Sequence, residues 1–308
     1  MINTTHMIIN LFFLLLWACT FTPAEQSELS ASDNHNQQQS TGEKDYWYKG
    51  VAEISSYQLK QARYGEIRKG HAVLIFVTEP FSKTTYTKAD RQGNNDESVL
   101  KLNFTKKFNT GIYPYSMMTS TFLPFDAGKH SLKISSSSQE WCGHTYMEMI
   151  RKDKLLNITT SSYFQGENRQ QQLALSFLED DFWSLIRLRP SQLPVGKHQV
   201  IPSFFYLRLK HKETKAYTCE LSLQKNGDSQ VYRLHYPELN RNLKIEFNTA
   251  FPHEIMSWQE QYPDGWTTDA PMLSTTGTLL KQIQTAYWQK NQNKHLRLRD
   301  SLLLTPQH

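Results

Sequence analysis

Apolar and polar residues alternate along most of the chain that follows residue 45. In LKIEF at 243–247 and VYRLHY at 231–236, polar residues stand between apolar ones. Because successive side chains on a strand point to opposite faces, this period of two predicts strands with one buried face. The same pattern predicts further strands over residues 46–59, 71–78, 99–108, 115–122, 131–136, 155–164, 199–210, 216–224, 279–288 and 295–299.

One segment departs from the alternation and predicts a short helix near 177–189. Its apolar residues recur at helical spacing. Ser176 and Glu179 have the spacing of a capping box, and Pro190 ends the pattern. Three acidic residues in the first turn complement the helix dipole.

Turn residues separate the predicted strands. Asn226-Gly227-Asp228 is the strongest hairpin signal, and residues 68–70 and 127–129 carry weaker ones. Short turns imply antiparallel pairing, because parallel strands need long crossover connections. The expected fold is therefore mostly β: a large twisted antiparallel sheet forming an open or half-closed barrel, with one short helix over a mouth or face. A β-sandwich is the alternative.

The N-terminal segment differs in composition from the rest. Residues 7–16 are almost entirely apolar, a length typical of a signal-peptide core and too short to span a bilayer. LWAC at 16–19 resembles the cleavage box of a bacterial lipoprotein, so residues 1–18 are expected to be a signal peptide and Cys19 to carry lipid. The polar residues of 19–44 predict a flexible tether. An ordinary secretory signal is the alternative.

These features predict one β-rich domain over 45–308, held by the lipid on Cys19 at the periplasmic face of a bacterial membrane or at the cell surface. The formal net charge of +5 is mild for 308 residues. A solvated surface explains it as well as an anionic partner does. Nucleic acid is not an expected partner in this compartment.

A disulfide between Cys142 and Cys219 is permitted in this compartment. On regular strands Cys219 would share an apolar face with Tyr217 and Leu221, whereas Cys142 would share a polar face with His144. This difference argues against pairing, but the sequence leaves both alternatives open.

Glu140, Cys142 and His144 form the most suggestive reactive group. Residues two apart on one strand project from the same face about 6.5–7 Å apart. An imidazolium at His144 would then lower the pKa of the Cys142 thiol and create a nucleophile, or the three side chains would ligate a metal. A structural cysteine is the commoner case.

No complete catalytic, metal or cofactor motif occurs elsewhere. His253 and Glu254 resemble the start of a zinc-protease helix, but Ser257 stands where the second histidine is needed. Phosphate-binding loops and dinucleotide fingerprints are absent from the sequence, so no cofactor or metal is expected. The acidic residues of 179–181 are interpreted as helix-dipole partners, not as an acid–base pair.

The aromatic residues are numerous, with 16 Phe, 15 Tyr and 7 Trp. Most are expected in the core of a β domain. Trp258 and Trp266 lie beside turn residues and are the predicted exceptions. In a groove their rings would contact a sugar or a lipid.

Four stretches give the chain a resemblance that covers residues 46–304: WYKGVAEI at 47–54, KKFNTGIYPYS at 106–116, QEWCGH at 139–144 and LRDSL at 298–302. They resemble a group of bacterial lipoproteins commonly labelled septum formation inhibitor Maf. True Maf proteins are cytoplasmic nucleotide pyrophosphatases with a Ser-Pro-Arg-Arg-type loop, which has no match here. The resemblance therefore implies the label and an envelope location, but no pyrophosphatase site.

The sequence as a whole predicts a membrane-anchored lipoprotein that acts as a non-enzymatic binding or structural module. Its expected ligand is an apolar molecule, a glycan or an envelope protein. The enzymatic alternative is a cysteine-dependent hydrolase or transferase that uses Cys142 and His144.

Overall fold

The computed structural model describes residues 41–90, 93–126, 128–265, 267 and 269–304. The chain divides into two compact units, residues 1–38 and 39–308, and the described residues all belong to the second. Within them, sixteen strands form a single sheet, and the helices are few and short.

The strands are β1 (Ala52–Arg63), β2 (Glu66–Ser82), β3 (Thr87–Lys88), β4 (Asp96–Thr110), β5 (Tyr113–Pro124), β6 (Lys133–Glu140), β7 (Gly143–Lys152), β8 (Leu155–Ser162), β9 (Arg169–Ala174), β10 (Phe177–Leu178), β11 (Gly196–Ile201), β12 (Tyr217–Asn226), β13 (Ser229–Tyr236), β14 (Arg241–Asn248), β15 (Ile255–Pro263) and β16 (Met272–Thr285). The α-helices are α1 (Thr41–Trp47), α2 (Glu179–Leu188), α3 (Phe204–Lys210) and α4 (Arg297–Ser301). Short 3-10 turns occupy Pro190–Gln192, Pro237–Leu239, Tyr287–Gln289 and Asn293–His295.

The sheet runs in the order β10-β11-β12-β13-β14-β15-β16-β1-β2-β4-β5-β6-β7-β8-β9, and β3 pairs with β2. Every pairing is antiparallel except β10 with β11. The two edges, β9 and β10, are neighbours in the chain, yet no ladder joins them among the described residues. The prediction of a large antiparallel sheet forming an open or half-closed barrel is therefore confirmed, and the sandwich alternative is wrong because the described strands form one sheet.

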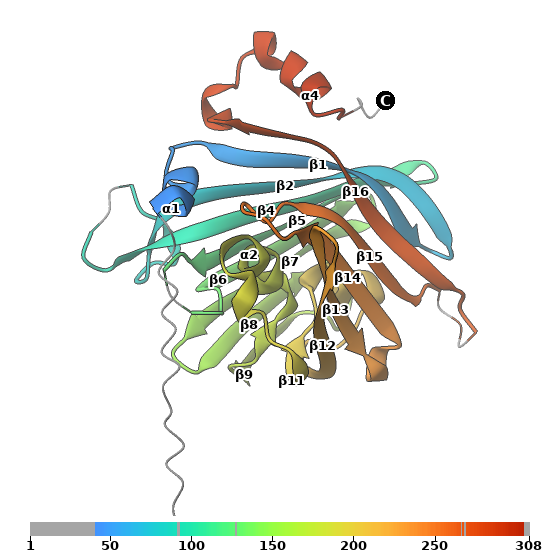
Figure 1. Ribbon diagram of the computed structural model, residues 1–308. Coiled ribbons are helices and arrows are strands. Elements are labelled where there is room, and N and C mark those ends of the chain that lie inside the picture. Colours follow the sequence, from blue (N-terminus) through green and yellow to red (C-terminus); the bar gives the residue numbers. More distant parts are fainter. Residues whose placement is uncertain (1–40, 91–92, 127, 266, 268, 305–308) are drawn as a thin grey trace, which may run out of the picture. The chain divides into compact units, whose positions relative to one another are not determined.

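Helix α2 lies on the concave side of the sheet (Figure 1). All ten of its residues are buried, and its apolar side chains join the main hydrophobic core. The helix is confirmed, but the capping box is wrong. Leu178 precedes the helix in extended conformation because it pairs with Ile201 as the end of β10, and the Ser176 hydroxyl donates to Ala174 instead.

The strand predicted over residues 199–210 is wrong in its second half, which forms helix α3. Residues 199–210 divide into the end of β11 and a helix whose Ser203 side chain accepts a hydrogen bond from Tyr206 N at 3.2 Å. The prediction failed because six of the seven helical residues are buried, so no polar face marks the helix. Together α2 and α3 fill the interior that an empty barrel would leave for an apolar ligand.

A second predicted strand, near the C-terminus, is also wrong. Residues 295–299 form helical turns and not a strand. Beyond them, Leu302 and Leu304 pack on Ile54, Val73 and Val77, on the outer face of the sheet, where Figure 1 also places α4. Strand β1 is therefore covered on both faces.

Two turn predictions have opposite outcomes. The hairpin at Asn226-Gly227-Asp228 is confirmed, since Asn226 pairs with Ser229 across a two-residue turn. The weaker signal at 68–70 is wrong, because those residues continue the ladder between β1 and β2. The third signal, at 127–129, includes residue 127, which lies outside the described residues.

Candidate functional site

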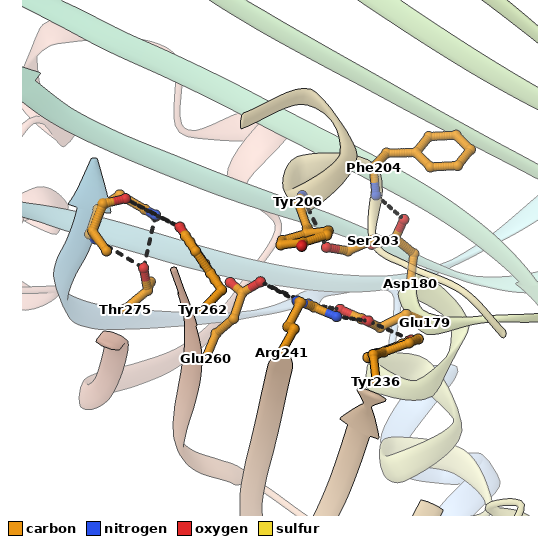
Figure 2. Close-up of polar contacts among 12 residues, drawn as sticks. Glu179, Asp180, Ser203, Phe204, Tyr206, Tyr236, Arg241, Glu260, Tyr262 and Thr275 are labelled. Carbon is orange, nitrogen blue, oxygen red and sulfur yellow. Dashed lines mark hydrogen bonds and ion pairs between the residues drawn. The ribbon is translucent and has the colours of Figure 1, made fainter. Parts of the chain in front are cut away.

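A buried ionic cluster connects α2 to the strands that surround it. Arg241 on β14 donates to both carboxylate oxygens of Glu179, each at 2.6 Å, and its Nε donates to Glu260 on β15 at 2.8 Å. The hydroxyl of Tyr236 donates to Glu179 at 2.8 Å. Figure 2 shows Arg241 between the two carboxylates. All four side chains are buried, so the cluster links α2 to β13, β14 and β15 inside the protein.

The other two acidic residues of α2 also have internal partners. Asp180 accepts a hydrogen bond from Phe204 N at 3.0 Å (Figure 2), and Asp181 accepts one from Ser131 N at 3.1 Å. Burial raises the pKa of Asp180 to about 8 and that of Asp181 to about 7. The helix-dipole interpretation was incomplete, because these carboxylates attach α2 to α3 and to the segment before β6.

The space beside this cluster is too small for a substrate. Burial lowers the pKa of Lys106, whose Nζ lies 5.4 Å from the ring centre of Phe104 and 5.1 Å from that of Phe205. The adjoining cavity measures about 10 Å³, enough for one water molecule at most. The cluster therefore stabilises the fold and offers no room for catalysis.

The predicted reactive group Glu140, Cys142 and His144 does not lie on one strand. Strand β6 ends at Glu140 and β7 begins at Gly143, so Cys142 occupies the exposed turn between them. Its backbone N–H donates to Glu140 Oε2 at 2.6 Å. Hydrogen bonding to the Glu140 carboxylate, with its negative charge, raises the pKa of the Cys142 thiol. This is the opposite of what a thiolate nucleophile needs.

The two cysteines are not brought together. Cys142 is free and exposed, while Cys219 is free and buried on β12 between Tyr217 and Leu221. The disulfide alternative is therefore wrong for this structure, and the predicted apolar face around Cys219 is correct. Burial raises the pKa of the Cys219 thiol to about 12. Among the described residues, no group of His, Cys, Asp and Glu is arranged to hold a metal ion.

Trp258 is not an exposed ligand contact. It is buried on β15 and packs against Tyr57, Phe104 and Trp183. The prediction failed because strand β15 was not recognised, so the tryptophan was assigned to a turn. Trp266 and Cys19 lie outside the described residues.

An open groove of about 710 Å³ lies across the outer face of β6, β7 and β8. Trp141, 68% exposed, and Tyr163, 74% exposed, are its most exposed aromatic side chains, and the less exposed Tyr146 lies in the same groove. Its remaining lining is mainly polar, with Ser137, Gln139, His144, Ser161 and Asn168 among its members.

The sheet register explains why these side chains gather. Gln139 pairs with His144, and Tyr146 pairs with both Ser137 and Ser161, so their outward side chains form one row. The predicted candidates Glu140 and His144 also line the groove, whereas Cys142 does not.

Gly143 leaves the space that the Tyr163 ring occupies. A Cβ built at Gly143 would lie 2.6 Å from Cδ1 of Tyr163, so only glycine lets the ring lie against this backbone. Tyr163 N also donates to His144 O at 3.1 Å. Trp141 and Tyr163 were not among the predicted site residues. The signal for Trp141 was a large aromatic residue two positions before a glycine.

Comparison of the chain with protein-family models, with curated proteins and with solved structures gives no match. Among the described residues, no helix is both long enough and apolar enough to cross a membrane.

Proposed function

We propose that this protein is a lipid-anchored envelope protein that binds a glycan, without chemical conversion, in the outer groove. The observation that carries the proposal is the pairing of two exposed aromatic rings, Trp141 and Tyr163, with a row of short polar side chains. Sugars present apolar C–H faces and many hydroxyl groups, and such a groove offers a partner to each.

The filled interior favours a glycan over the apolar ligand. Helices α2 and α3 and the aromatic core occupy the concave side of the sheet. The groove volume of about 710 Å³ lies within the range of small-ligand sites. A short oligosaccharide fits this size and polarity better than a lipid chain does.

The groove lies away from the first described helix. Helix α1, the first described element, contacts the segment after β5 at the other end of the sheet. Lys44 of the helix pairs with Asp126, and Tyr48, just after the helix, packs on Phe125. The groove lies at the end formed by the β6–β7 turn. The groove and the first described helix therefore lie at opposite ends of these strands. The septum-formation label stays a prediction from resemblance.

Isothermal titration with chitotriose, cellotriose and maltotriose tests the proposal on the purified chain. We expect one of these probes to bind, and Trp141→Ala to weaken that binding at least tenfold, which corresponds to about 1.4 kcal/mol. Trp288→Ala is the matched control. That tryptophan is also exposed, but it lines a separate recess beside Trp47, so its loss should leave affinity unchanged. Absence of binding, or equal affinities for both variants, contradicts the proposal.

A further inference from the structure

A second cavity of about 330 Å³ lies on the inner side of the same strands. Thr145 and Met147 of β7 and Thr160 of β8 form one wall, and the end of α3, with Leu207 and Arg208, forms another. Its volume is at the lower end of the range for small-molecule sites. This cavity is called the mouth cavity below.

The guanidinium of Arg208 is buried with few close partners. The side chain is 9% exposed, its Nε has no hydrogen-bond partner in the described part of the chain, and Nη1 lies 4.0 Å from Glu167 Oε1. Its contacts with the ring nitrogens of His211 are long, at 3.3 and 3.4 Å, and its charge rests over the Phe164 ring at 4.5 Å. The one ion pair that Arg208 forms among the described residues, with Glu167, is at the limit of such a contact, so the buried cation has capacity for a closer negative ligand.

The surroundings are positive as well. Buried Arg63 donates to a backbone carbonyl and to two tyrosine hydroxyls, and forms no ion pair among the described residues. Arg169 and Lys212 lie on the wall of the mouth cavity. Glu213, an acidic wall residue, is paired with Lys215 at 3.4 Å.

Glu167 is the carboxylate nearest to Arg208. It accepts hydrogen bonds from Ser162 Oγ and pairs with His211. Burial alone would raise the pKa of Glu167, but these contacts and the charge of Arg208 lower it, so the group is ionised. Glu167 Oε1 lies 4.0 Å from the Arg208 guanidinium, on the side from which a ligand carboxylate would approach. A ligand carboxylate would bind the guanidinium at a shorter distance.

We propose that the mouth cavity binds a small organic anion, a carboxylate or a phosphate, through Arg208, and that Glu167 occupies the site as an internal competitor. The planar guanidinium suits both kinds of oxygen anion. This site does not depend on the glycan groove, because Trp141 does not line it.

Titration calorimetry in a buffer free of other anions tests the site with inorganic phosphate, D-glucuronate and uncharged D-glucose. We expect one anion to bind and glucose not to bind. Arg208→Met should weaken anion binding at least tenfold, whereas Glu167→Gln should strengthen it several-fold, because it removes the competitor. Trp141→Ala should leave it unchanged. The preferred probe distinguishes phosphate from carboxylate ligands.

Opposite effects of the two substitutions are the decisive result, since a merely structural role would not tighten binding. If Arg208→Met fails to fold, exposed Arg169→Gln provides the loss variant, with an expected fall of about threefold. Binding of neither anion at millimolar concentration overturns the proposal. Weaker binding by Glu167→Gln, or equal binding of glucose, also overturns it.

Discussion

The substitution Gly277→Ala should destabilise the fold sharply, because Trp258 lies directly on this glycine. A Cβ built at Gly277 would come within 2.1 Å of Cη2 and Cζ2 of the indole. The ring cannot move aside easily. Tyr57, Phe104 and Trp183 surround it, with ring centres 4.8, 5.4 and 5.5 Å away.

The expected cost follows from this overlap. Ordinary contacts of a Cβ begin near 3.4 Å, so the added methyl group would overlap the ring by more than 1 Å. Overpacking of a rigid core typically costs about 1–3 kcal/mol. Since both the backbone of β16 and the indole are fixed, we expect Gly277→Ala to lower the free energy of unfolding by about 3 kcal/mol.

Equilibrium urea unfolding of the domain, followed by circular dichroism, measures this change. Trp258→Phe should itself destabilise the protein, but it also makes room for the methyl group. The double variant should therefore be more stable than the sum of the single effects predicts, by about 1–2 kcal/mol. Gly42→Ala is the control, because nothing lies within 4 Å of a Cβ at this helical position.

Two results would refute this reasoning. One is a loss below about 0.5 kcal/mol for Gly277→Ala, which is the range of ordinary surface substitutions. The other is strict additivity of Gly277→Ala and Trp258→Phe, which would show that the indole does not exclude the methyl group.

Three further predictions concern the buried charges and the thiols. Arg241→Ala should lower the free energy of unfolding by about 3–5 kcal/mol in urea titrations, because two buried carboxylates lose their cation, whereas Arg233→Ala on β13 should cost less than about 1 kcal/mol. Burial raises the pKa of Asp180 to about 8 from an ordinary 3.8, so the folded protein holds a proton that the unfolded chain releases. The contribution of this group to stability is therefore fully present below about pH 4 and is lost as the pH rises to about 8. The slope is about 1.4 kcal/mol per pH unit, and urea midpoints from pH 5 to pH 7 should vary less with pH in Asp180→Asn. A maleimide should label Cys142 in the folded protein and Cys219 only in denaturant, so early labelling of Cys219 would contradict its burial.

The alternation of polar and apolar residues predicted most strands because the sheet has two unlike faces. The prediction from alternation failed for two segments that do not lie in the sheet. The segment 204–210 is buried on nearly every side, so a helix there has no polar stripe to reveal it. The segment 295–299 alternates regularly but forms helical turns outside β1, and Leu296, which the pattern would bury, is exposed.

The candidate site was predicted only in part, because it depends on one turn. Glu140 and His144 do line the groove. The two turn residues, however, are Trp141 and Cys142, and neither is the glycine or asparagine typical of a two-residue turn. The sequence therefore predicted a continuous strand. The partner ring, Tyr163, comes from the end of β8, and its place against the preceding hairpin depends on a register that only the folded sheet defines.

The curvature of the sheet explains why binding is assigned to the outer face and the mouth. An amphipathic helix normally turns its charged face to water, but the sheet encloses α2 completely. Its acidic residues must then find partners inside, which Arg241, Phe204 N and Ser131 N provide. These contacts and the aromatic core leave a cavity of only about 10 Å³ beside α2. For the described part of the chain, we therefore expect recognition of other molecules where the strands meet solvent, as at the groove beside Trp141 and the cavity beside Arg208.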